Sequence, residues 1–313
     1  MTGDGYEHLH PEMCAMADLD DAARIARIQA GRWIEHPSVT RALEVLQETF
    51  EQPARDRMEN VLLIGESGMG KTMLVTKFER ANAVPDDVAA GVRRRPVVVV
   101  LMPPEPTPGD FFDRLLTTLG APLKSRWGAR PEQRREVATA ILREIGTRVL
   151  VIDEINSILA GTARQQRLFL QLLRFLSNDL KMALVCAGIP EARHALLSDA
   201  QLRSRFCDIE LPLWRVDADL QAFVTRLVTS LPLRRPSPID SVKLRRLLVE
   251  RSGGITIHIC RAIEKAAIAA IHSGREMIDL TGLANDAVWR GIALPPSTVS
   301  AMARGRRSET RVS

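Results

Sequence analysis

Aromatic residues are scarce in this sequence. Its 313 residues include eight Phe, four Trp and one Tyr, which together make up 4% of the chain. This scarcity argues against a module that binds single-stranded nucleic acid by stacking several bases on an aromatic platform. If the protein binds nucleic acid, we therefore expect it to contact the phosphates.

Closely spaced cysteines and long apolar runs are also missing. The four cysteines include no C-x-x-C pair, which argues against a disulfide framework or a zinc site. No stretch approaches 18 consecutive apolar residues, and the first residues are acidic where a signal peptide would be basic. We therefore expect a cytoplasmic protein without a membrane partner.

The composition that remains is that of an ordinary globular protein. Charged residues make up 26% of the chain and hydrophobic residues 45%, and the formal net charge is +5. A chain of this length is expected to form about two domains. Its excess of positive charge is compatible with contact to a phosphate backbone.

Short apolar runs alternate with helical patterns up to about residue 213. The runs are too continuous for half-exposed strands, so we expect parallel strands that are covered on both faces. The expected strands are 61–64, 97–101, 149–152, 183–186 and 209–211, and the helices between them are 72–82, 109–119, 131–145 and 164–180. This alternation predicts an α/β fold with a three-layer, parallel, five-stranded sheet.

Segments of different character flank this sheet region. The first 20 residues show no helical periodicity and carry neither Lys nor Arg, whereas apolar residues recur at helical spacing after the last strand. A break near His36 and Pro37 divides the pattern before the sheet into two helices. The predicted parts are a loosely ordered acidic arm over 1–20, N-terminal helices over 21–50, the α/β core over 51–213, a smaller all-helical domain over 214–292, and a basic disordered tail over 293–313. Four helices are expected in the all-helical domain, over 220–231, 241–251, 256–272 and 281–290.

A complete phosphate-binding loop directly follows the first expected strand and precedes a helix. Glycines allow such a loop to wrap a phosphate, and the N–H groups of the loop and of the helix N-terminus point at negative charge. Lys71 is expected beside the β- and γ-phosphates of a bound nucleotide, and the Thr72 hydroxyl is expected to coordinate Mg²⁺. The eight residues that fit G-x-x-x-x-G-K-[ST] are Gly65, Glu66, Ser67, Gly68, Met69, Gly70, Lys71 and Thr72.

Two adjacent acids, Asp153 and Glu154, end the third expected strand. A parallel sheet brings these carboxylates to its carboxyl edge, beside the phosphate loop. We expect Asp153 to hold Mg²⁺ through water, and Glu154 to orient or deprotonate the attacking water. The loop and the acidic pair together favour nucleotide hydrolysis over a kinase reaction, for which we identify no acceptor pocket in the sequence.

With these residues the sequence resembles the AAA+ P-loop ATPases, and more narrowly the transposition ATPases of the TniB and TnsC kind. The resemblance spans about residues 20–290 and implies an AAA+ core with a helical lid domain. Its most specific stretches are Arg32-Trp33-Ile34, 57–65 leading into the phosphate loop, 153–156, and 187–192.

The resemblance implies roles for two further groups at the nucleotide. Arg205 matches the arginine that AAA+ proteins offer to the γ-phosphate of a neighbouring subunit, with Arg203 as its competitor. A planar, permanently charged guanidinium suits that role. The sensor-2 position falls on His258, where relatives commonly have Arg, or on Arg261 one turn later.

A polar side chain is missing where AAA+ proteins usually carry sensor 1. The strand expected over 183–186 runs into Ala187 and Gly188, neither of which can hold a water by its side chain. We therefore expect slow hydrolysis, with Asn156 as the nearest substitute.

The resemblance also implies a protein that works on duplex DNA. ATP would drive assembly into rings or a helical filament, which would select or mark the target and recruit a transposase and a TniQ-like target-selection protein. Hydrolysis would then remodel or disassemble the assembly. A basic segment is the candidate for sequence-independent phosphate contacts. Its residues are Lys124, Ser125, Arg126 and Arg130, followed by Arg134 and Arg135.

Two alternatives share these motifs. A helicase-loader-like replication ATPase would differ in its partner, and an appended DNA- or helicase-binding domain, which we do not find, would favour it. A nucleotide-gated scaffold would bind ATP and assemble with little turnover. Its best support is the missing polar side chain at sensor 1.

Overall fold

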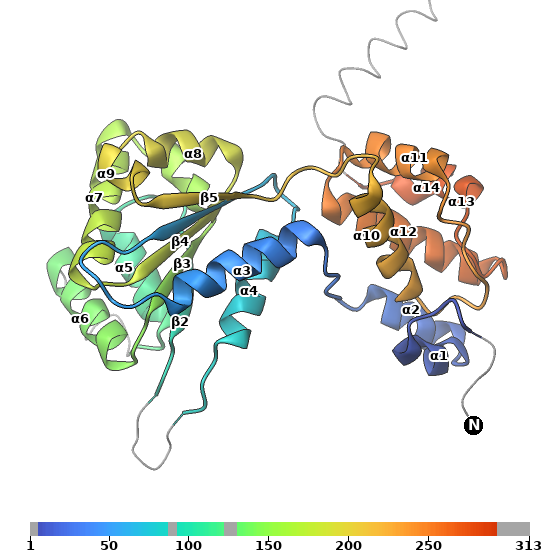
Figure 1. Ribbon diagram of the computed structural model, residues 1–313, viewed down its shortest axis with the longest axis horizontal. Coiled ribbons are helices and arrows are strands. Elements are labelled where there is room, and N and C mark those ends of the chain that lie inside the picture. Colours follow the sequence, from blue (N-terminus) through green and yellow to red (C-terminus); the bar gives the residue numbers. More distant parts are fainter. Residues whose placement is uncertain (1–5, 87–92, 122–129, 293–313) are drawn as a thin grey trace, which may run out of the picture. The chain divides into compact units, whose positions relative to one another are not determined.

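The structure is a computed structural model that describes residues 6–86, 93–121 and 130–292 (Figure 1). The chain divides into two compact units. The sheet unit spans Ser38–Pro212, whereas the helical unit combines the residues up to Pro37 with those from Leu213 onward. Residues near both ends of the chain therefore build one unit.

Five parallel strands form the sheet, in the order β2-β3-β4-β1-β5. Three of them, β1, β3 and β4, are buried along their whole length, because their Val, Leu and Ile residues are covered on both faces. The predicted five-stranded parallel sheet is confirmed. The strands are β1 (Asn60–Ile64), β2 (Val97–Leu101), β3 (Val149–Asp153), β4 (Ala183–Gly188) and β5 (Phe206–Glu210).

Helices cover the sheet on both faces and complete three layers (Figure 1). Alternate strand residues pack with α5, α6 and α7 in one hydrophobic core, while α4 lies against β2 and β4 and contacts α3 through the Phe50 and Phe78 rings. The helices of this unit are α3 (Pro37–Glu51), α4 (Lys71–Ala81), α5 (Pro108–Thr118), α6 (Pro131–Glu144), the 3₁₀ helix η2 (Ile155–Ala160), α7 (Ala163–Asp179), α8 (Pro190–Leu197) and α9 (Ala200–Arg203).

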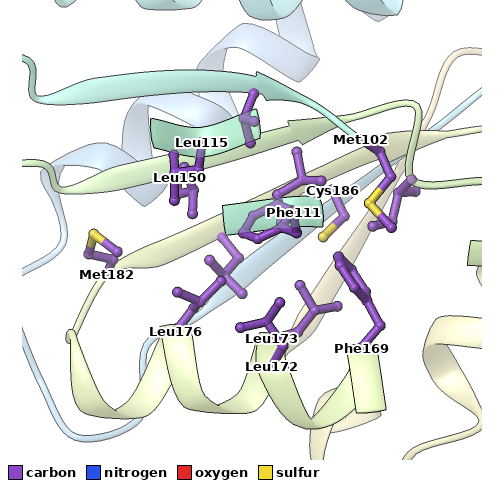
Figure 2. Close-up of a cluster of buried hydrophobic side chains, with 14 of the residues drawn as sticks. Met102, Phe111, Leu115, Leu150, Phe169, Leu172, Leu173, Leu176, Met182 and Cys186 are labelled. Atoms are coloured by element: carbon purple, nitrogen blue, oxygen red, sulfur yellow. The ribbon is translucent and has the colours of Figure 1, made fainter. Parts of the chain in front are cut away.

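The apolar face of α7 closes this core from one side. Figure 2 shows Leu172, Leu173 and Leu176 of α7 turned toward Leu150 of β3 and Cys186 of β4. All five side chains are buried. Leu176 lies four residues after Leu172 and three after Leu173, so these side chains form one continuous apolar stripe of α7 that faces the sheet.

The last strand departs from the sequence prediction. We predicted a strand over 209–211 that is covered on both faces, whereas β5 starts at Phe206 and leaves Cys207, Asp208 and Glu210 exposed. The strand pairs with β1 alone and forms an edge of the sheet, where polar residues reach water. The prediction followed the short apolar run and missed the polar residues before it.

The prediction of a loosely ordered arm over 1–20 is wrong for the residues that the structure describes. Residues Pro11–Ala17 form the helix α1, whose inner face is apolar. The signal for this helix is a spacing of four residues between apolar side chains, which the acidic character of the segment obscures. The buried residues of this segment are Leu9, Met13 and Ala17.

The N-terminal helices predicted over 21–50 belong to different units. The helix α2 is part of the helical unit, whereas α3 is part of the sheet unit.

The stretch 281–290, predicted as one helix, forms two short helices. The Asn285 side chain accepts the Ala287 N–H and thereby starts a new helix. No helix in the described part of the chain has the length and apolar character to span a membrane. Besides α1, the helices of this unit are α2 (Asp21–Gln29), α10 (Ala218–Thr229), α11 (Val242–Ser252), α12 (Thr256–His272), α13 (Leu280–Ala284) and α14 (Asp286–Trp289).

An ion pair fastens α2 inside the helical unit. The Arg24 side chain is fully buried and donates to both carboxylate oxygens of Glu276, at 2.7 and 2.8 Å. Arg24 also donates to the Pro232 carbonyl and to Asp21. Such a bidentate pair is among the stronger charge-assisted interactions in proteins. These hydrogen bonds hold the pKa of Glu276 below its ordinary value of 4.5.

Aromatic rings mark the two places where the chain crosses between the units. The chain leaves the helical unit just after His36 and returns just before Trp214. The ring centroids of His36 and Trp214 are 4.8 Å apart, and Phe223 of α10 stacks on Trp214 at 4.6 Å. Burial lowers the pKa of His36 to about 4, so this ring is neutral at pH 7.

We expect Glu276→Ala to destabilise the helical unit by about 3–5 kcal/mol, because it leaves the buried Arg24 charge without its partner. Urea unfolding followed by tryptophan fluorescence measures this loss, since Trp33, Trp214 and Trp289 lie in the helical unit. The pair should stabilise the unit above pH 4.5, and its contribution should vanish as the pH falls through the lowered pKa of Glu276.

The control is Asp286→Ala, which removes an 88% exposed partner of Arg251 from the same unit. This substitution should change the unfolding free energy by less than about 1 kcal/mol, because exposed ion pairs contribute little. Equal effects of the two substitutions would contradict the importance given to the buried pair.

Candidate functional site

The predicted phosphate loop connects β1 to α4, and its glycines satisfy distinct backbone requirements. Gly68 and Gly70 have φ angles of 82° and 94°, in the left-handed region that favours glycine. At Gly65 a β-carbon would lie 3.1 Å from the Leu211 carbonyl oxygen, so the close approach of the chain after β5 favours a residue without a side chain.

The ammonium of Lys71 lies inside this loop. Its Nζ donates to the carbonyls of Gly65 at 2.6 Å and Glu66 at 3.0 Å, and the residue is only 5% exposed. Burial lowers the pKa of this lysine below its ordinary value, while the nearby carboxylates of Glu154 and Asp153 oppose the shift. The loop therefore holds a positive charge at the N-terminus of α4, where backbone N–H groups also attract anions.

The phosphate loop and the acidic strand end meet through one side-chain hydrogen bond. The Thr72 hydroxyl donates to Oδ2 of Asp153 at 2.7 Å, although the two residues are 81 positions apart. Asp153 is 2% exposed, whereas Thr72 faces outward. A hydroxyl and a carboxylate side by side are hard oxygen donors of the kind that Mg²⁺ prefers, so the residues present fit this ion.

Glu154 follows Asp153 in a left-handed conformation. Its φ angle is 56°, which is uncommon for a residue with a side chain, and its N–H donates to Oδ1 of Asp153 at 2.9 Å. The chain thereby turns out of β3 into η2, and the half-buried Glu154 lies at the same sheet edge as the phosphate loop. Unusual backbone conformations of this kind gather at functional sites.

Arg205 lies at the amino end of the parallel strands, whereas the phosphate loop lies at their carboxyl end. Its carbonyl accepts the N–H of Asn60, the first residue of β1, whereas the phosphate loop follows the last residue of that strand. The two ends of this five-residue strand are roughly 13 Å apart at 3.3 Å per residue. Arg205 is half-buried and donates to the Asn178 side chain, while Arg203 is exposed and donates to the Leu197 carbonyl.

The two sensor-2 candidates belong to α12 of the helical unit. The ring of His258 makes a 3.1 Å hydrogen bond through Nδ1 with the Ser252 carbonyl. Arg261 is exposed one turn further along the helix. The choice between them stays a prediction.

The candidate DNA-binding segment lies largely outside the described residues, which include neither Lys124 nor Ser125 nor Arg126. Arg130 is exposed at the N-terminus of α6. The two arginines that follow make contacts within the chain, which the sequence did not indicate. Arg134 pairs with Asp113 at 3.0 Å, and the guanidinium of Arg135 lies over the Phe175 ring at 5.1 Å.

The sequence matches the family described as Bacterial TniB protein over residues 24–216, which is more than half of the chain. The chain belongs to the TniB family. This membership confirms the family resemblance seen in the motifs. No curated protein matches the TniB chain.

Solved structures confirm the AAA+ P-loop ATPase fold. The Aeropyrum pernix ORC1 protein in complex with DNA is 17% identical, with a TM-score of 0.58 over 91% of the TniB chain and 71% of that chain. The ORC2 protein of the same organism is 16% identical, with a TM-score of 0.60 over 88% and 74%. Cdc6p from Pyrobaculum aerophilum is 16% identical, with a TM-score of 0.57 over 83% and 68%.

We expect Thr72→Ala to weaken binding of ATP in the presence of Mg²⁺ by at least about 10-fold, because it removes one of two adjacent oxygen donors. Binding in EDTA should change little. Titration with a fluorescent ATP analogue under both conditions measures the difference.

Thr76→Ala is the matched control, since Thr76 lies one turn further along α4 and its hydroxyl donates to the Thr72 carbonyl. This variant should bind like the unmodified protein. Equal losses with Mg²⁺ and with EDTA in Thr72→Ala would remove Thr72 from the metal site.

Proposed function

We propose that this TniB protein is an ATPase that assembles on duplex DNA during transposition. ATP binding drives assembly into a ring or filament that selects or marks the target and recruits a transposase and a TniQ-like target-selection protein. Hydrolysis remodels or disassembles the assembly. The hydrogen bond between Thr72 and Asp153 carries this proposal, because it joins the phosphate loop to the acidic strand end.

The residues at this edge suit the hydrolysis of ATP to ADP and phosphate. Lys71 and the loop N–H groups bind the phosphates, and Thr72 and Asp153 are the residues that would hold Mg²⁺. When bound, Mg²⁺ supplies charge neutralisation at the β- and γ-phosphates. Glu154 accepts a proton as the water oxygen bonds to the γ-phosphorus and the bond to the ADP oxygen breaks.

Arg205 is suited to act on the nucleotide of a neighbouring copy. It lies at the amino edge of its own sheet, roughly 13 Å from its own phosphate loop along β1. An arginine in that place contributes to hydrolysis only across a subunit interface, which makes assembly a condition for turnover. The sensor-2 role that the family resemblance implies falls to either His258 or Arg261 of α12.

Contact with duplex DNA rests on the TniB family, on the basic segment that ends at Arg130 and on the similarity to an ORC1 protein in complex with DNA. Lys124, Ser125, Arg126 and Arg130 provide sequence-independent phosphate contacts, whose affinity falls with salt. Such contacts suit a protein that accepts many target sites.

A nucleotide-gated scaffold with little turnover is the second candidate. Gly188, the last residue of β4, supports it, since this strand end carries no side chain to position a water. Both candidates bind ATP and assemble, and they differ in whether hydrolysis follows.

We expect Glu154→Gln to lower kcat for ATP hydrolysis at least about 100-fold, because the amide cannot accept the proton. ATP binding and assembly on DNA should persist. Phosphate release measures turnover, and electron microscopy with duplex DNA and either ATP or a non-hydrolysable analogue measures assembly.

Glu144→Gln, at an exposed end of α6, is the control and should retain the unmodified rate. Hydrolysis by Glu154→Gln at the unmodified rate would refute its role as the base. Equal assembly with ATP and the analogue, without phosphate release by the unmodified protein, would favour the scaffold. Absence of any ring or filament would refute the assembly.

We also expect complementation between two inactive variants. Lys71→Ala loses its own nucleotide site but still offers Arg205, whereas Arg205→Ala keeps its nucleotide site and lacks the arginine. In a 1:1 mixture at most about one quarter of head-to-tail interfaces combine the intact halves, so hydrolysis should return to no more than about that fraction.

Each variant alone should remain inactive, with a loss on the order of 10³-fold for Arg205→Ala. Arg203→Ala, a neighbouring exposed arginine, should retain activity alone. Loss of activity in Arg203→Ala together with retention in Arg205→Ala would exchange the roles of the two arginines.

A further inference from the structure

A second polar side chain lies beside Glu154 at the carboxyl edge of the sheet. Asn156 belongs to η2, which the left-handed turn at Glu154 directs across the end of β4. Its Oδ1 is 3.3 Å and its backbone nitrogen 3.4 Å from the position of a β-carbon on Gly188. Asn156 therefore covers the last residue of β4.

The amide oxygen of Asn156 is buried beside Gly188 and has no hydrogen-bond partner among the described residues. Its neighbours differ in this respect, because Lys71, Thr72 and Asp153 all make side-chain hydrogen bonds. Buried polar atoms in native proteins are almost always paired. An acceptor without a partner beside a nucleotide-binding loop points to a group that arrives with the ligand.

Gly188 cannot supply a polar group itself. A β-carbon there would lie 2.7 Å from Cγ2 of Ile155, a distance that atoms essentially never reach. Ile155 is fully buried in the core, so it cannot move aside readily. The packing of η2 thus excludes any side chain at the end of β4 and puts Asn156 in its place.

The Gly188 carbonyl, at the strand end that Asn156 covers, also holds the phosphate loop. The Gly188 carbonyl accepts the N–H of Gly65 at 3.1 Å, and the Gly65 carbonyl accepts the Lys71 ammonium. Asn156, Gly188, Gly65 and Lys71 are therefore joined in one continuous chain of contacts from η2 to the phosphate-binding charge.

We infer that the Asn156 amide holds the water that attacks the γ-phosphate. This inference deepens the proposed ATPase function and rests on it. Glu154 takes one proton of the water as its oxygen bonds to the γ-phosphorus, and the amide oxygen of Asn156 accepts a hydrogen bond from the other hydrogen. The products are ADP and phosphate, and Asn156 is unchanged.

The test compares Asn156→Ala, Asn156→Asp and Ser157→Ala with the unmodified protein on duplex DNA. We expect Asn156→Ala to lower kcat about 10- to 100-fold, as for other groups that orient a reactant, with KM and ATP affinity within about twofold. Its Tm should not fall, because the variant loses an unpaired buried acceptor. Asn156→Asp keeps an oxygen at the same place and should recover part of kcat.

Ser157 is the neighbouring residue on η2, is equally half-buried, and is a matched control whose kcat should not change. Full kcat in Asn156→Ala would overturn the inference. A drop in Tm and ATP affinity parallel to kcat, with no recovery in Asn156→Asp, would also overturn it and leave a structural role. Failure of the unmodified protein to hydrolyse ATP would refute the proposed function itself, and the inference with it.

Discussion

The parallel pairing of β1, β3 and β4 is the constraint on which the candidate chemistry depends. Parallel neighbours end at the same edge of the sheet, so the residues after each strand meet there although they are far apart in sequence. Gly65, Asp153 and Gly188 are those strand ends or their next residues. The hydrogen bonds from Thr72 to Asp153 and from Gly65 to Gly188 then fix their mutual positions.

Packing of the core determines which side chains this edge can carry. A side chain at position 188 would need the space that Ile155 fills in the core, so this position carries glycine. A polar group at the end of β4 is thereby excluded, and the turn at Glu154 delivers Asn156 instead. The composition of the site is in this sense a consequence of how η2 packs on the sheet.

The sheet and the phosphate loop were predictable because their signals are local. Continuous runs of Val, Leu and Ile indicate buried strands. The positive φ angles at Gly68 and Gly70 explain why the loop motif has glycine at these positions. The contact between Arg24 and Glu276 was not predictable, because it joins residues 252 positions apart. The lack of room for a side chain at Gly188 was not predictable either, because it depends on Ile155, which follows a different strand. The predicted start of the edge strand β5 was too late in the sequence, because the polar residues at its beginning resemble a loop.

The helical unit is discontinuous in sequence, and this has a consequence for how the protein is made. During synthesis the whole sheet unit emerges between the two parts of the helical unit, so α2 must wait for most of the chain before Glu276 can pair with Arg24. A fragment that begins at the phosphate loop would therefore lack part of the helical unit's interior. Expression trials should keep the segment before Pro37, because the helices near the end of the chain fold around it.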